Sequence, residues 1–128
     1  MELDIRVGIL KDAGQIDEEV YRNVIKAISF FQDIWSIELK EENGAMLITH
    51  LCIALQRVKN NCPVEKIDEE LYEEVKKNQY FEISEKAFYA LKSELNIDIS
   101  ENEKSFLMMH LCVLFENENI KEYEGELN

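Results

Sequence analysis

Two histidines are the residues of this chain whose type and position best suit chemistry. His50 and His110 are the only histidines among 128 residues, and each lies in the middle of a strongly apolar run. The two runs also match in pattern, since residues 49–55 read THLCIAL and residues 109–115 read MHLCVLF. A neutral imidazole is a good nucleophile near pH 7, and its phosphoramidate is labile enough to pass the phosphoryl group on. Two histidines in matching contexts therefore favour a role as phosphate acceptors. The alternative for each histidine is a structural role, in which its ring is hydrogen-bonded to a neighbour in the core.

Helical geometry predicts a charged residue on the same stripe as each histidine. Residues seven apart differ by only about 20° around a helix axis. Arg57 therefore shares a stripe with His50 and can hold an anion near it, while Glu103 shares a stripe with His110. Asn117 continues the His110 stripe in the other direction. Both charged residues also have structural interpretations. Arg57 lies near the C-terminal end of a predicted helix, where a cation interacts favourably with the helix dipole, and Glu103 fits a helix-capping box.

A metal site is the main rival interpretation, because the pattern His-x-Cys occurs at residues 50–52 and again at 110–112. Side chains two residues apart on a helix point about 200° away from each other, so they cannot both reach one ion. The three cysteines fit reduced thiols, and Cys52 and Cys112 lie in apolar runs without a base on their own face. We therefore expect no metal, no cofactor and no catalytic residue, and hence no enzyme.

The charge of the chain argues against several classes of partner. The sequence has 27 acidic and 14 basic residues, which gives a formal net charge of −13. Such a field repels nucleic-acid backbones and anionic membrane surfaces, and no cluster of Lys and Arg interrupts it. The first twenty residues are too charged for a signal peptide, and no apolar run approaches the roughly 18 residues that span a bilayer. We expect a cytoplasmic protein that binds neither nucleic acid nor membrane.

The elements that position the histidines are expected to be helices within one domain. The spacing of apolar residues predicts five helices and no strand, over about residues 17–37, 45–59, 68–78, 84–95 and from residue 100 onward. A polar break at residues 40–44 precedes the second helix. This helix and the fifth carry the histidines and are apolar nearly all round, so they should be central. The predicted domain spans residues 17–117, between an N-terminal extension, 1–16, and a frayed acidic tail, 118–128.

The ordered motifs resemble the phosphotransferase-system regulation domain, or PRD. Residues 49–51 and 54–57, THL and ALQR, have the shape of the family's first histidine motif. Phe106 and residues 109–111, MHL, have the shape of the second. Pro63, residues 80–83 (YFEI) and residues 99–103 (ISENE) stand between the two motifs in the order of the family. The resemblance extends over about 75 residues.

This resemblance implies an all-α, five-helix bundle of antiparallel helix pairs that usually dimerises. It also implies that His50 and His110 are phosphoacceptors, with the histidine-containing phosphocarrier protein or a sugar-permease component as the donor. Family members usually carry paired copies beside an RNA-antiterminating or DNA-binding module, whereas this chain holds one copy and no segment that reads as such a module.

The resemblance thus predicts a stand-alone regulatory domain of bacterial sugar-uptake control that signals to a regulator protein or through a homodimer. The alternative is a constitutive dimerisation or adaptor domain whose histidines are structural. A metal-dependent enzyme is the third and weakest hypothesis.

Overall fold

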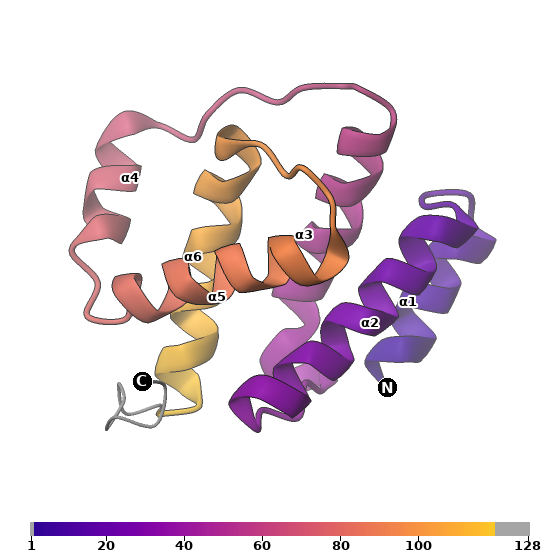
Figure 1. Ribbon diagram of the computed structural model, residues 1–128, viewed down its shortest axis with the longest axis horizontal. Helices are drawn as coiled ribbons and strands as arrows, with labels where there is room; N and C mark the ends of the chain where they lie inside the picture. The colour runs from indigo at the N-terminus through magenta and orange to yellow at the C-terminus, as the bar shows by residue number, and fades with distance from the viewer. Residues whose placement is uncertain (1, 120–128) are drawn as a thin grey trace.

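A computed structural model describes residues 2–119, and every regular element in that range is a helix (Figure 1). Six helices follow one another: α1 (Leu3–Asp12), α2 (Glu18–Trp35), α3 (Glu41–Lys59), α4 (Glu69–Lys76), α5 (Phe81–Leu95) and α6 (Glu101–Asn117). The predicted all-α class is confirmed, whereas the predicted count of five helices is too low by one. The acidic tail predicted for residues 118–128 lies outside the described residues from residue 120 onward.

Helix α1 is the extra element, and it lies within the segment that we expected to be an extension. Its apolar side chains follow an alternating pattern from Leu3 to Ile9, with Gly8 among them, so the sequence lacks a clear helical stripe. In the fold Leu3 and Val7, four residues apart, are buried against α2 and α3, while Ile5 and Ile9 remain exposed. Tertiary packing therefore holds this helix where the local pattern gives only weak guidance.

Helix α3 begins about four residues earlier than predicted, because the polar stretch at residues 40–44 forms its first turn. The Asn43 side chain accepts a hydrogen bond from the backbone N–H of Lys40 at 2.6 Å, and two glutamates occupy the positive end of the helix. A Cβ atom added at Gly44 would lie 3.1 Å from Leu3 Cδ1 and 3.2 Å from Leu39 Cδ2. Gly44 is thus a position of close packing and does not break the helix.

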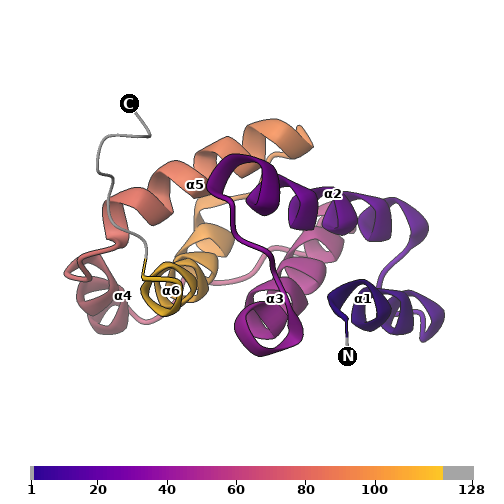
Figure 2. The same ribbon diagram turned by 90° about the horizontal axis from the view of Figure 1, so that it is seen from below.

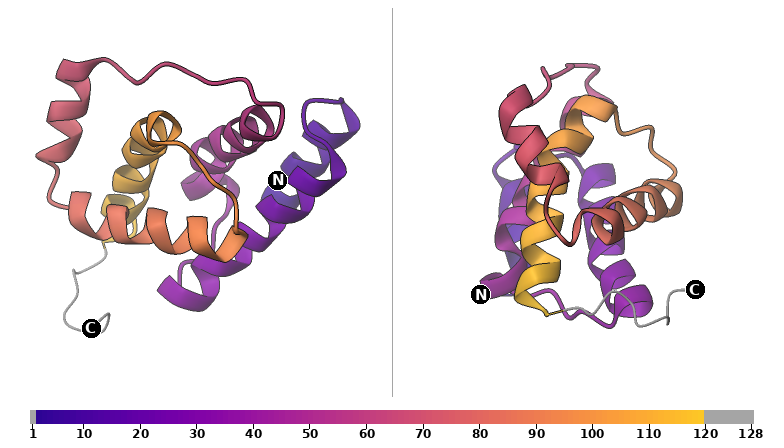
Figure 3. Two further views of the ribbon diagram at one scale, coloured as in Figure 1. Left: turned by 45° about the horizontal axis from the view of Figure 1, so that its top comes forward. Right: turned by 90° about the vertical axis from the view of Figure 1, so that its left-hand side faces the viewer.

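The six helices form two layers (Figure 2). Helices α1, α3, α6 and α4 lie side by side in one layer, and α2 and α5 cross this layer on one side, as the views in Figure 3 also show. Large side chains from both layers fill the space between them and are almost completely buried, among them Phe31, Leu51, Phe88, Met108 and Phe115. The opposite side of α3 and α6 is left without a covering helix in the described part of the chain.

Helices α3 and α6 run antiparallel at the centre of the four-helix layer. Asn43, near the start of α3, donates a hydrogen bond to Glu118 just beyond the end of α6. Arg57, near the end of α3, binds Glu103 in the first turn of α6. The middle turns of the two helices are therefore side by side, and each of them carries a histidine.

Candidate functional site

The rings of His50 and His110 meet across the interface of α3 and α6. Their centroids are 5.3 Å apart and their planes are tilted by 40°. Phe106, one turn before His110, stacks on His50 at 5.6 Å with an interplanar angle of 24°. The fold thus brings both predicted site residues into one cluster, which has an aromatic side wall. The position of Phe106 four residues before His110 is the signal that could have predicted this wall.

Both imidazoles are held in the neutral form by their surroundings. Each ring is half-buried, and this burial lowers the pKa of both His50 and His110 below its ordinary value. For His50 the proximity of His110 and of the Arg57 guanidinium lowers the pKa further, while the carboxylate of Glu103 opposes these effects. Near pH 7 each ring therefore keeps an unprotonated nitrogen, which is the nucleophilic form.

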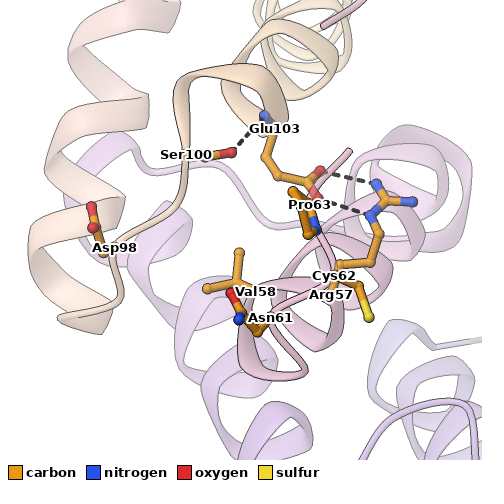
Figure 4. Close-up of a pocket in the computed structure, with 8 residues that line it drawn as sticks. All are labelled: Arg57, Val58, Asn61, Cys62, Pro63, Asp98, Ser100 and Glu103. Carbon is orange, nitrogen blue, oxygen red and sulfur yellow. Dashed lines mark hydrogen bonds and ion pairs between the residues drawn. The ribbon is translucent and has the colours of Figure 1, made fainter. Parts of the chain in front are cut away.

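Arg57 and Glu103 form a two-pronged ion pair, which Figure 4 shows. Arg57 Nε donates to one carboxylate oxygen at 2.8 Å, and a terminal guanidinium nitrogen donates to the other at 2.9 Å. The Glu103 side chain is 3% exposed and that of Arg57 is 30% exposed. The structure thus brings two of the three predicted supporting residues together near His50, but they bind each other, which their sequence positions did not reveal.

The same carboxylate also approaches His50. Glu103 Oε1 lies 4.0 Å from His50 Nε2, which is too long for a hydrogen bond. This nitrogen is buried, and it has no hydrogen-bond partner among the described residues. A buried polar atom without a partner is uncommon in folded proteins and calls for an explanation at the site.

The capping box predicted at the start of α6 forms only in part. Ser100 Oγ accepts a hydrogen bond from the backbone N–H of Glu103 at 3.1 Å, so the predicted cap is present. The Glu103 carboxylate, however, points to Arg57 and not back to Ser100 (Figure 4). A buried carboxylate gains more from a charged, two-pronged partner than from one neutral backbone donor.

Asn117 is exposed at the last residue of α6 and lines a pocket together with His110. This pocket has a volume of about 320 Å³ and lies between the first turns of α3 and the second half of α6, with Met46 and Val113 in its walls. A smaller pocket of about 160 Å³ lies beside Arg57 and Glu103 (Figure 4). His50 lines neither pocket.

Exposed apolar side chains surround the histidines on the uncovered side of α3 and α6. Met46, Ile53 and Val113 are 71%, 44% and 53% exposed, and each lies within about 60° of a histidine around its own helix axis. We call this surface, formed by Met46, His50, Ile53, His110 and Val113, the histidine face. Apolar side chains grouped on an open surface commonly mark a site of association.

The cysteines are unsuited to nucleophilic chemistry at this site. Cys52 and Cys112 are buried, and burial raises the pKa of both thiols, that of Cys52 to about 12. These thiols stay protonated near neutral pH. Within residues 2–119, no three side chains among His, Cys, Asp and Glu lie close enough together to hold a metal ion.

One buried polar cluster was not predicted from the sequence. Lys104 is only 5% exposed, and its ammonium group donates to Glu85 at 2.7 Å and to the Tyr89 hydroxyl at 2.9 Å. The cluster joins α5 to the first turn of α6, the turn that also carries Glu103. It therefore contributes to the placement of the ion pair.

Comparison with known proteins supports the assignment suggested by these helices and histidines. A family model described as "PRD domain" matches residues 25–112, which is more than half of the chain. The chain belongs to the PRD domain family. The matched PRD segment includes both histidines, Arg57 and Glu103. PRD domains are regulatory and not catalytic, in line with the expectation of a protein without enzymatic activity.

A curated relative resembles this PRD over most of both chains. The "Uncharacterized protein YhfY" of Escherichia coli (strain K12) is 22% identical over 113 residues, covering 88% of this chain and 94% of the relative. No solved structure gives a significant match. Among residues 2–119, no helix combines the length and the apolar character that crossing a membrane requires.

Proposed function

We propose that this PRD is a phosphorylation-responsive regulatory domain of bacterial sugar-uptake control, acting in the cytoplasm. The histidine pair receives phosphate from the phosphotransferase system, through the histidine-containing phosphocarrier protein or a sugar-permease component. The observation that carries the proposal is the juxtaposition of His50 and His110, two neutral imidazoles 5.3 Å apart on an open face. Membership of the PRD family supports the same role.

The transfer of the phosphoryl group requires from this domain only an unprotonated imidazole nitrogen as the nucleophile. The lone pair of an imidazole nitrogen attacks phosphorus, a new P–N bond forms, and the P–N bond to the donor's histidine breaks. The proton on the other ring nitrogen is released to the departing imidazole, so charge and atoms balance. The product adds about two negative charges to an apolar surface, by analogy with hydroxyl phosphorylation. A change of this size in the histidine face alters what that face can bind.

The output is expected through association, either as a homodimer or with a regulator protein. Met46, Ile53 and Val113 supply apolar area around the two rings, and a phosphate placed among them disfavours a closely packed contact. Direct nucleic-acid binding does not fit, because the chain carries a net charge of −13.

The alternative is a constitutive dimerisation or adaptor domain in which the histidines are structural. A structural histidine in a core normally has its ring nitrogens hydrogen-bonded. His50 Nε2 is buried without such a partner in the described structure, and His110 lines an open pocket. The first observation argues against an ordinary hydrogen-bonded core role for His50, and the second favours a chemical role for His110.

The test is incubation of the purified chain with phosphoenolpyruvate and the general phosphotransfer proteins, followed by intact mass at neutral pH. A second series adds sugar-permease components. A mass gain of at least one phosphoryl group is expected, and it should disappear when phosphoenolpyruvate is omitted. No gain with any of these donors would contradict the proposal and favour the adaptor alternative.

A further inference from the structure

We infer that the histidine pair is a one-phosphate site, in which His110 is the acceptor and the Arg57–Glu103 ion pair keeps His50 unmodified. This inference rests on the proposed function and adds to it the identity of the acceptor and the residues that select it. Arg57 and Glu103 are thereby positioning residues, because they act through the histidines.

Access differs between the two rings. His110 lines the pocket of about 320 Å³ that opens between α3 and α6, so a donor can approach its ring. The outer nitrogen of His50, Nε2, is buried, and the ring is stacked on Phe106 at 5.6 Å with the tilted His110 ring 5.3 Å away. A phosphorus atom cannot reach this nitrogen in line without displacing a neighbour.

The neighbouring charges also favour His110 over His50 as the acceptor. The buried Glu103 carboxylate lies 4.0 Å from His50 Nε2, so a phosphoryl group on this nitrogen would place two anions in contact. Arg57 is the cation on the same side of α3, but its charge is already paired with Glu103 through Nε and one terminal nitrogen. The pair is thus neutral as a unit and offers no net attraction to a phosphate on His50.

The short distance between the rings also limits the pair to one phosphate. Two phosphoryl groups on rings with centroids 5.3 Å apart would bring about four negative charges together. Once His110 is modified, its charge opposes a second transfer. The ion pair and a phosphate on His110 therefore both disfavour phosphorylation of His50.

The probe is potassium phosphoramidate, which phosphorylates accessible histidines without a protein donor. An imidazole nitrogen attacks phosphorus, the P–N bond of phosphoramidate breaks, and the departing nitrogen takes the ring proton and leaves as ammonia. Intact mass at neutral pH counts the groups added, so the result depends on access and charge and not on the choice of donor.

Single variants locate the acceptor. Wild type is expected to gain one phosphoryl group and His50→Gln the same, whereas His110→Gln should gain about tenfold less because Nε2 of His50 is buried. Two groups on wild type, or loss of labelling in His50→Gln, would overturn this inference and leave the proposed function standing. No labelling of wild type, by phosphoramidate or by the phosphocarrier chain, would overturn both.

Glu103→Gln tests the selecting role of the ion pair. The amide keeps the shape of the side chain, removes its charge and releases Arg57 to bind a phosphate on His50. In the His110→Gln background, where no phosphate on His110 opposes the transfer, Glu103→Gln is expected to raise the residual labelling of His50 several-fold, while the matched control Glu101→Gln, an exposed residue of the same helical turn, should leave it unchanged. A folded protein with both Glu103→Gln and His110→Gln that labels no more than His110→Gln alone would overturn the role of the pair. Circular dichroism reports folding, and the single histidine variants decide the acceptor independently of it.

Discussion

The imidazole rings of His50 and His110 lie 5.3 Å apart, although 60 residues separate them in the sequence. The antiparallel packing of α3 on α6 creates this proximity, and it also places Arg57 on Glu103 at one end of the interface. One helix–helix contact therefore assembles the nucleophiles and the neighbouring charges together. Changes at this interface should affect stability, association and phosphate acceptance in separable ways.

Stability should fall as the histidines are protonated. Burial lowers the pKa of both rings below the ordinary value of 6.5, so the unfolded chain binds protons more readily than the folded one. The contribution of the neutral rings is fully present above pH 6.5 and is lost as the pH falls through the lowered values. Urea denaturation should show a falling midpoint over this window, and His50→Gln combined with His110→Gln should flatten the fall. An unchanged pH dependence in the double variant would contradict the burial effect.

Arg57→Ala should be strongly destabilising, because it leaves the buried Glu103 carboxylate without its partner. The expected loss in the free energy of unfolding is about 3 kcal/mol, as for other broken buried pairs. The matched control is Lys59→Ala, two residues away, whose ammonium group contacts Asp17 at 2.6 Å and Glu19 at 2.7 Å at the exposed surface. This control should lose less than about 1 kcal/mol. Equal losses measured by denaturant titration would show that the Glu103 carboxylate is solvated.

Two glycines should respond in opposite ways to larger side chains. Gly8 lies within α1 with open space around it, so Gly8→Ala should raise the free energy of unfolding by about 0.5–1 kcal/mol. Gly44 is pressed against the side chains of Leu3 and Leu39, so Gly44→Leu should lower it by about 1–3 kcal/mol. The melting temperatures of the two variants, compared with that of wild type, test both predictions. Destabilisation by Gly8→Ala would contradict the helical state of α1.

The sequence predicts five of the six helices and identifies both histidines as candidate site residues, because these features depend on local patterns. The Ser100 cap, the apolar runs around the histidines and the seven-residue spacing of Arg57 from His50 can all be read without a partner helix. The contact between Arg57 and Glu103 cannot be read in this way, because it depends on the register of α3 against α6. Helix α1 was missed for a related reason, since the burial of Leu3 and Val7 exists only after packing on α2 and α3.

The histidine face should form the contact of a homodimer in solution. Met46, Ile53 and Val113 give this face an apolar surface, and symmetric association would cover it. Sedimentation at tens of micromolar is expected to show a dimer for wild type and a monomer for Ile53→Glu. Ile34→Glu, at an exposed apolar residue of α2, is the matched control and should remain dimeric.

The same sedimentation experiment connects the dimer to the proposed switch. His50→Asp and His110→Asp introduce a negative charge at the histidine face and should change the dissociation constant. A monomeric wild type would refute the dimer. An unaltered dissociation constant and shape in both aspartate variants would leave the dimer standing and count against the switch.

The most direct test of the central claim compares wild type with His50→Gln combined with His110→Gln. Both proteins are incubated with phosphoenolpyruvate and the phosphotransfer proteins, and the phosphate gained is measured by intact mass at neutral pH. We predict a gain in the wild type and none in the double variant, whose folding is checked by circular dichroism. Equal labelling of the two proteins would contradict the assignment of phosphate acceptance to the histidine pair.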